Sequence, residues 1–169
     1  IRKGSLKMTQ EGHKEFRHLI RKAVETDARQ IAGLLNIYAA DQLLLPRSEE
    51  DILKYLANFV VAETDTGEFI GCAALRNFGD GLYEVRSLAV KKEFAGHGLG
   101  SKLVSFLVQR LRETHTTARV FALTNRAAIF KRLGFHTVTK DLFPQKIWSD
   151  CAVCPKKDHC DEEAVMLEI

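Results

Sequence analysis

The chain has 169 residues, of which 46% are hydrophobic and 28% charged, and its formal net charge is +3. This length and balance fit one folded domain with a substantial core. Acidic and basic residues are interspersed, and no apolar run approaches the ~18 residues that cross a bilayer. We therefore expect no nucleic-acid partner, no membrane partner and a cytoplasmic location. Residues 1–8 are basic without the apolar centre of a signal peptide, so residues 1–17 are predicted to be disordered or vector-derived and residues 18–169 to form the domain.

The first half of the domain predicts a strand, two helices and an antiparallel meander. A helix begins after candidate caps at Thr26 and Asp27, a break follows at Pro46, and Ser48 can cap the next helix. Apolar runs separated by the short turns "DTG" and "FGDG" are typical of hairpins. The predicted elements are a strand at 18–25, helices at 28–38 and 48–57, and strands at 58–64, 68–75 and 82–90.

The second half predicts alternating helices and strands. Leucines and Phe106 recur at helical spacing after a glycine-rich loop, and Gly134 can end the following helix. The predicted elements are helices at 99–114 and 125–133, strands at 118–123, 135–143 and 163–169, and a cysteine-rich insert at 144–161. The order describes a mixed α/β domain with a mostly antiparallel sheet of about seven strands and about four helices.

The loop "EFAGHGLGS" at 93–101 joins a predicted strand to a predicted helix. Free N–H groups at a helix N-terminus favour anions, and glycines let a ligand approach the backbone closely. The loop lacks the Gly-Lys-Ser/Thr ending of a Walker motif, and it follows a meander rather than the first strand of a dinucleotide fold. The pattern favours a phosphate site, with a plain tight turn as the alternative.

This combination resembles the GNAT superfamily of acetyl-CoA-dependent N-acetyltransferases, whose signature is Gln/Arg-x-x-Gly-x-Gly/Ala. The better frame here is Ala95 to Gly100, and a second frame would begin at Glu93. In either frame the Gln or Arg is missing. "SLAV" at 87–90 and the later "N-x3-IF-x3-GF" also match. The resemblance implies a GNAT (acyl-CoA N-acyltransferase) fold.

Within that superfamily the chain resembles most the acetyltransferase domain of N-acetylglutamate synthase. "LLPRS", "GCAAL", "FALTNR" and the tail "LFPQKIWSDCAVCPKKDHCDE" carry this resemblance. It implies a short, stand-alone form without an amino-acid-kinase domain. The implied reaction is direct transfer of acetyl from acetyl-CoA to L-glutamate in a ternary complex, the first step of arginine synthesis.

The resemblance also implies positions for acetyl-CoA. Backbone N–H groups of the loop would hold its pyrophosphate, and one near Leu88 to Val90 would polarise the thioester carbonyl. His97 could touch a phosphate or face solvent. Phe130 stands where many members have a tyrosine acid, so it would pack on the pantetheine instead. The expected acetyl-CoA residues are Leu88, Ala89, Val90, Gly96, His97, Gly98, Leu99, Gly100, Ser101, Asn125 and Phe130.

Glu84, on the strand predicted at 82–90, is the candidate general base. The alternative is a solvated glutamate paired with Arg86. Arginine binds carboxylates through a bidentate fork, which suits an acceptor with two carboxylates, although each arginine could also be a plain surface residue. With the resemblance, the expected acceptor residues are Arg47, Ser48, Arg86, Leu123, Thr124 and Arg126.

Three of the four cysteines, Cys151, Cys154 and Cys160, fall within ten residues, with His159 between them. Cys-x2-Cys is half of a usual zinc site, but the second half is compressed. The two interpretations are a structural zinc and a set of reduced thiols.

The sequence is also compatible with other functions. The acceptor could be another small amine or a protein N-terminus, or the chain could be a non-catalytic module that binds acetyl-CoA. A homodimer is also compatible with the sequence.

Overall fold

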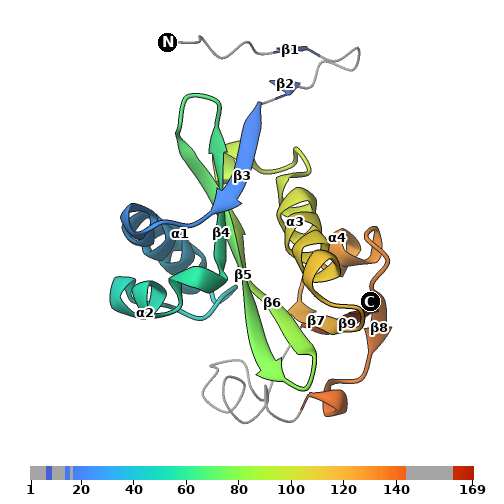
Figure 1. Ribbon diagram of the computed structural model, residues 1–169. Coiled ribbons are helices and arrows are strands. Elements are labelled where there is room, and N and C mark those ends of the chain that lie inside the picture. Colours follow the sequence, from blue (N-terminus) through green and yellow to red (C-terminus); the bar gives the residue numbers. More distant parts are fainter. Residues whose placement is uncertain (1–6, 9–13, 16, 144–161) are drawn as a thin grey trace.

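The computed structural model describes residues 7–8, 14–15, 17–143 and 162–169. Within these residues, seven strands form one sheet in the order β3-β4-β5-β6-β7-β9-β8. Neighbouring strands run antiparallel except β6 and β7, which are parallel. Helices α1 and α2 cover one face of the sheet, and α3 and α4 cover the other (Figure 1). No helix in this described part is long and apolar enough to cross a membrane.

The elements have the following bounds. The strands of the main sheet are β3 (His18–Lys22), β4 (Phe59–Thr64), β5 (Phe69–Gly79), β6 (Leu82–Val90), β7 (Arg119–Thr124), β8 (His136–Val138) and β9 (Glu163–Glu168). The helices are α1 (Ala28–Ala40), α2 (Glu49–Lys54), α3 (Leu99–Thr114) and α4 (Ala127–Lys131). Short 3-10 turns are η1 (Glu25–Asp27), η2 (Leu56–Asn58), η3 (Lys92–Phe94) and η4 (Lys140–Leu142). The short strands β1 (Lys7–Met8) and β2 (Lys14–Glu15) pair with each other.

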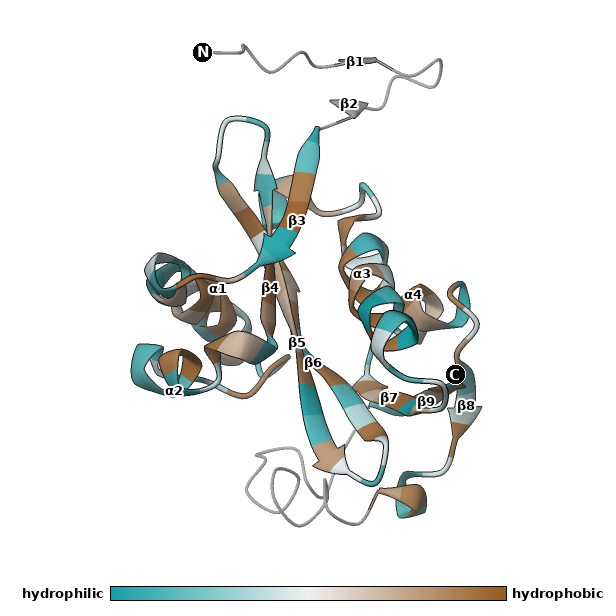
Figure 2. Cartoon of the chain, viewed as in Figure 1, coloured by the Kyte–Doolittle hydropathy of each residue, from teal (hydrophilic) through white to brown (hydrophobic). Residues whose placement is uncertain are grey.

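Two apolar layers hold the helices to the sheet. On one face, Leu103 and Leu107 of α3 pack with Val60 and Val85 of the sheet. On the other, α1 packs against β4 and β5 in a separate cluster. Hydrophobic residues dominate β4 and the part of β5 between the helices, whereas hydrophilic residues enter near the β5–β6 turn (Figure 2). The end of this hairpin mixes hydrophilic and hydrophobic residues, and its Leu82 and Phe78 pack in a third apolar cluster with Phe121 and Phe143.

The predicted order of elements and the mostly antiparallel sheet are confirmed, and α3 and β6 have the predicted bounds. The strand predicted at 135–143 is wrong in its second half, where η4 replaces extended chain. Phe143 explains the turn, because it is buried and stacks on Phe121 with ring centroids 3.9 Å apart. Burying this ring brings the chain back over the sheet, so β8 stays a short edge strand.

The N-terminus of α1 also differs from the prediction that Asp27 caps this helix. Asp27 makes no side-chain cap to the helix. Its carboxylate accepts the N–H of Val24 at 2.7 Å and a two-pronged pair from Arg21 at 2.7 and 3.0 Å, and Arg21 also reaches Glu63. Burial raises the pKa of Asp27, but the hydrogen bonds from Arg21 and Val24 outweigh it, so the pKa lies below its ordinary value. The ionised carboxylate therefore stabilises this junction between β3 and α1.

Asp27→Asn is expected to lower the free energy of unfolding by about 1–2 kcal/mol at pH 7, because Arg21 then keeps Glu63 but loses its two-pronged pair with a charged carboxylate. A group whose pKa is lower in the folded state stabilises the fold above its unfolded pKa of about 4 and loses this effect as the pH falls through the folded pKa. Urea unfolding of both proteins at pH 7 and pH 3 measures the difference. The difference in unfolding free energy between the two proteins should be smaller at pH 3 than at pH 7. A difference that does not change with pH would contradict a stabilising role for the Asp27 charge.

Candidate active site

The sheet opens between β6 and β7. These strands pair only from Leu82 to Glu84 and from Arg119 to Phe121. Beyond this point β6 stays paired with β5, while β7 stays paired with β9, so the two halves of the sheet separate. A cavity of about 330 Å³ lies in the opening. Backbone groups of β6 that would meet a neighbouring strand face this cavity instead.

A bulge reshapes β6 where it lines the cavity. Arg86 pairs with Ala74 and Ala89 with Cys72, so Ser87 and Leu88 together face one residue of β5. Ser87 has a φ of +53°, and the Cys72 thiol donates to the Ser87 carbonyl at 3.5 Å. Complete burial raises the pKa of Cys72 to about 12, which keeps this donor protonated. The bulge turns backbone groups out of the ladder and toward the cavity.

The glycine loop forms a second wall of the same cavity. Gly96 and Gly98 have φ values of +81° and +78°, and Gly98 is the N-cap residue of the 16-residue helix α3. Gly98, Leu99, Gly100 and Ser101 all line the cavity. The first N–H groups of a helix have no partner within the helix, and its dipole favours an anion. This geometry suits a phosphate, and the phosphate role stays a prediction.

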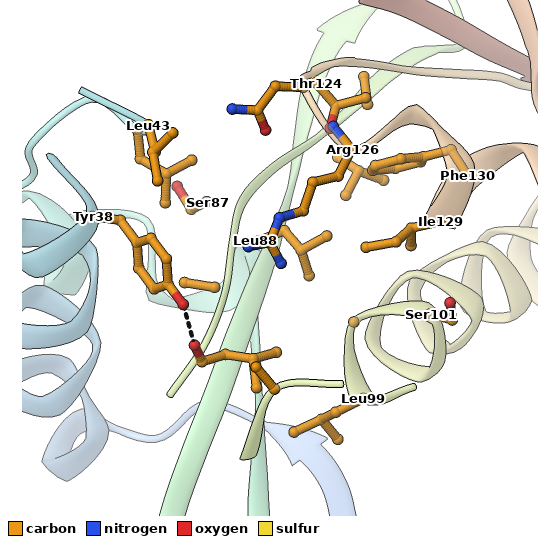
Figure 3. A pocket seen from close by; sticks show the side chains of 18 of the residues that line it. Tyr38, Leu43, Ser87, Leu88, Leu99, Ser101, Thr124, Arg126, Ile129 and Phe130 are labelled. Carbon is orange, nitrogen blue, oxygen red and sulfur yellow. Dashed lines mark hydrogen bonds between the residues drawn. The ribbon is translucent and has the colours of Figure 1, made fainter. Parts of the chain in front are cut away.

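Side chains from α1 and α4 close the cavity from opposite sides (Figure 3). Tyr38 of α1 is 9% exposed, and its hydroxyl donates to the Val90 carbonyl. Phe130 of α4 is 2% exposed and makes an edge-on contact with Phe135. Arg126 extends from the start of α4 toward Leu88 in the middle of the view. The cavity thus has an apolar wall, a hydroxyl and a guanidinium along an exposed strand edge.

A second cavity of about 550 Å³ adjoins the first. Arg47, Arg76 and Arg86 line it, together with Asp51 and the ring of Tyr55. Arg86 lines both cavities and therefore stands at their junction. The Arg47 guanidinium lies 5.3 Å from the Phe59 ring centre, and its Nε bonds the Asp51 carboxylate at 2.7 Å. This second space is lined by fixed cations, which suits an acidic ligand.

Glu84 lies at the point where the sheet divides. It is directly opposite Arg76 on β5 and Phe121 on β7, and it is 1% exposed. Its Oε1 lies 3.6 Å from the Nε of Arg86. The alternative prediction of a solvated glutamate paired with Arg86 is therefore right about Arg86 and wrong about solvation, because the Glu84 side chain is buried. Because Arg86 lines both cavities, Glu84 is one side chain away from the space where they meet.

The structure brings together most of the predicted site residues, in two groups. Ser48 instead accepts the N–H of Asp51 as the N-cap of α2, and His97 is exposed outside the described lining of either cavity. The predicted site residues that line the first cavity are Leu88, Ala89, Val90, Gly96, Gly98, Leu99, Gly100, Ser101, Leu123, Thr124, Asn125, Arg126 and Phe130. Arg47 and Arg86 line the second.

Two residues of these walls, Tyr38 and Arg76, were missed by the sequence reasoning. Tyr38 reads as an ordinary apolar-face residue of a helix, so nothing local marks its hydroxyl. Arg76 shares the strand of Ala74 at a spacing of two, and this alternation places it on the same face as Ala74. This spacing is the one sequence feature that indicates the face on which Arg76 lies. It does not show that Glu84, from a later strand, is the residue opposite Arg76.

The predicted zinc ligands Cys151, Cys154 and Cys160 lie outside the described residues. Among the residues that the structure does describe, no group of His, Cys, Asp and Glu could hold a metal ion. The zinc site therefore stays a prediction from the sequence.

Comparison with known proteins points to one family. A family model described as the acetyltransferase (GNAT) domain matches residues 56–137. An uncharacterized N-acetyltransferase of Chlorobaculum tepidum is 40% identical over 147 residues, covering 87% of this chain and 94% of that protein. An amino-acid acetyltransferase of Mycobacterium tuberculosis is 33% identical over 124 residues, covering 72% of this chain and 70% of that protein.

Solved structures agree with this result. N-acetylglutamate synthase from Neisseria gonorrhoeae, complexed with coenzyme A and N-acetyl-glutamate, superposes with a TM-score of 0.77 at 28% identity. The match covers 92% of this chain but only 36% of that synthase. A Mycobacterium tuberculosis protein in complex with CoA gives a TM-score of 0.74 at 29% identity, covering 89% of this chain and 99% of that protein. The chain thus spans nearly all of one solved relative and about a third of the other.

Proposed function

Since the chain belongs to the GNAT family of acetyltransferases and is an acetyl-CoA-dependent N-acetyltransferase, we propose that its acceptor is the α-amine of L-glutamate. The observation that carries this proposal is the arginine-lined second cavity, which meets the first cavity at Arg86. The synthase from Neisseria gonorrhoeae, complexed with coenzyme A and N-acetyl-glutamate, supports the same acceptor. The product would be N-acetylglutamate.

The first cavity suits acetyl-CoA. The positive φ values of Gly96 and Gly98 allow the loop to present backbone N–H groups at one end of it, where the pyrophosphate would bind. The exposed edge of β6 can hydrogen-bond the amides of the pantetheine as a neighbouring strand would. Neither Ala95 nor Glu93 supplies the side-chain donor of the usual signature, so the backbone would carry most of this binding.

Acetyl-CoA supplies a thioester whose carbonyl carbon the neutral amine attacks. The C–S bond then breaks and CoA leaves as a thiolate that takes up a proton through water, while the new amide nitrogen loses its second proton to solvent. The bulge at Ser87 and Leu88 would donate a backbone N–H to the carbonyl oxygen, which becomes more negative as the amine adds. Glu84 would accept the ammonium proton through water, because its Oε1 lies 3.6 Å from the Nε of Arg86, which lines both cavities. Phe130 has no proton to give, so it would only pack against the pantetheine.

Thiol release from acetyl-CoA tests the acceptor. We expect glutamate to have the highest kcat/KM in a panel that also holds glutamine, aspartate, spermidine and a short peptide with a free N-terminus. A large preference for spermidine or the peptide would contradict the proposal and assign another acceptor class. Calorimetric binding of CoA without turnover on any amine would instead indicate a binding module.

A further inference from the structure

Arg76 lies in the wall of the second cavity, close to the proposed base. It is the direct partner of Glu84 across the β5–β6 ladder. Side chains of directly opposed residues project from the same face of a sheet, with Cβ atoms about 5 Å apart. Any acceptor amine that Glu84 deprotonates therefore lies within the reach of an arginine side chain at position 76.

The Arg76 guanidinium is held by an aromatic stack. Its central carbon lies 4.4 Å from the ring centre of Phe78. Phe78 in turn contacts Phe121 at 5.7 Å, and Phe121 stacks on Phe143 at 3.9 Å. A guanidinium that uses its face for an aromatic contact keeps its N–H donors in the plane of the group, where they match a carboxylate. The stack therefore presents Arg76 in a fixed orientation at a low entropic cost for binding.

The ladder places the two β-strand arginines at different distances from the bulge. Arg86 is paired with the small Ala74, next to the bulge, whereas Arg76 is two residue pairs further away, and its guanidinium lies over Phe78 toward the hairpin turn. The amine and the α-carboxylate of an amino acid share one carbon, so the α-carboxylate must stay near the reacting carbonyl and Arg86. A side-chain carboxylate extends further, toward Arg76.

The described lining of this cavity is mainly cationic. It has three arginines, Arg47, Arg76 and Arg86, and one carboxylate, Asp51. A lining of this kind attracts an acidic ligand more strongly than a neutral one.

We infer that Arg76 is the specificity-determining residue that binds the distal carboxylate of the acceptor and so selects a dicarboxylic amino acid over its amide. This inference rests on the proposed function and adds a residue that binds the end of the acceptor's side chain. The expected signature is a change in acceptor preference. The loss of a purely structural arginine would instead impair all acceptors alike.

The test compares glutamate with glutamine as acceptors for Arg76→Gln. We expect kcat/KM for glutamate to fall by about 10²-fold, mainly through KM, because the carboxylate loses a charged bidentate partner. With glutamine kcat/KM should stay within about threefold, since an amide gains little from a guanidinium. Arg76→Lys keeps the charge without the fork and should fall between the two. Arg29→Gln, an exposed position on α1 outside the described lining of both cavities, is the matched control.

The outcomes separate the inference from the proposed function. Wild-type preference for glutamate that persists in Arg76→Gln, or an equal loss with both acceptors, overturns the role of Arg76 and leaves the function standing. A wild-type enzyme that acetylates other amines but no dicarboxylic amino acid overturns both. Calorimetric binding of CoA, unchanged in Arg76→Gln, establishes that the variant is folded.

Discussion

Glu84→Gln is expected to lower kcat by about 10²- to 10³-fold, the usual range for loss of a general base. Glutamine keeps the shape of a side chain that is only 1% exposed, so the change removes the proton acceptor with little repacking. Without it, the ammonium must lose its proton to hydroxide. The rate of the variant should therefore continue to rise with pH, and its optimum should shift upward. Thiol release at saturating glutamate, measured from pH 6 to 10, gives both quantities.

The control for this prediction is Glu113→Gln, at an exposed position of α3. It changes the same chemical group without touching either cavity and should retain wild-type kinetics. The substitution also removes a negative charge 3.6 Å from the Nε of Arg86, so CoA affinity and the melting temperature need to be measured alongside. A folded Glu84→Gln protein with the wild-type rate and pH profile would remove Glu84 from the mechanism.

Gly98→Asp is expected to weaken CoA binding strongly while the fold survives. Gly98 has a φ of +78° at the N-cap of α3, and a Cβ built on it meets no atom within 4 Å. Asp and Asn are the side chains that best tolerate this left-handed region, and both are good N-cap residues. A carboxylate about 6 Å from the pyrophosphate would cost about 2 kcal/mol. This corresponds to a rise in Kd of about 30-fold.

Gly98→Asn isolates the charge, because it has the same shape and backbone preference as the aspartate variant. Its Kd for CoA should stay within about threefold of the wild type, a change of well under 1 kcal/mol. Calorimetry at two salt concentrations completes the design, since screening should narrow the gap between the two variants as ionic strength rises. Equal Kd values for the two variants would mean that no phosphate of CoA lies near this loop.

Local sequence patterns were sufficient to predict the helices and strands whose own residues show a regular apolar spacing. The helix at 99–114 was predicted with its observed bounds, because glycines precede it and its apolar residues repeat at helical spacing. The strand at 82–90 likewise has its predicted bounds. At 135–143 the alternation was misleading, since Phe143 gains more from stacking on Phe121 than from extending β8.

The candidate site was predictable to the extent that it depends on contiguous residues. Gly96 to Ser101 line the first cavity, apart from His97. Arg47 and Arg86 were named as acceptor residues but could not be related to each other, because they meet only through the packing of α2 and η2 beside the hairpin. Arg76 was missed for the same reason.

The sequence by itself determined the class of the domain, the order of its elements and the glycine loop for which we propose an anion. Each of these depends on residues within one turn or one strand of each other. Only the tertiary structure decided where β6 and β7 part, how Tyr38 faces the first cavity, and that Glu84 lies between Arg76 and Phe121. These depend on pairings between segments tens of residues apart, which are selected by burial of the whole core and not by any local preference.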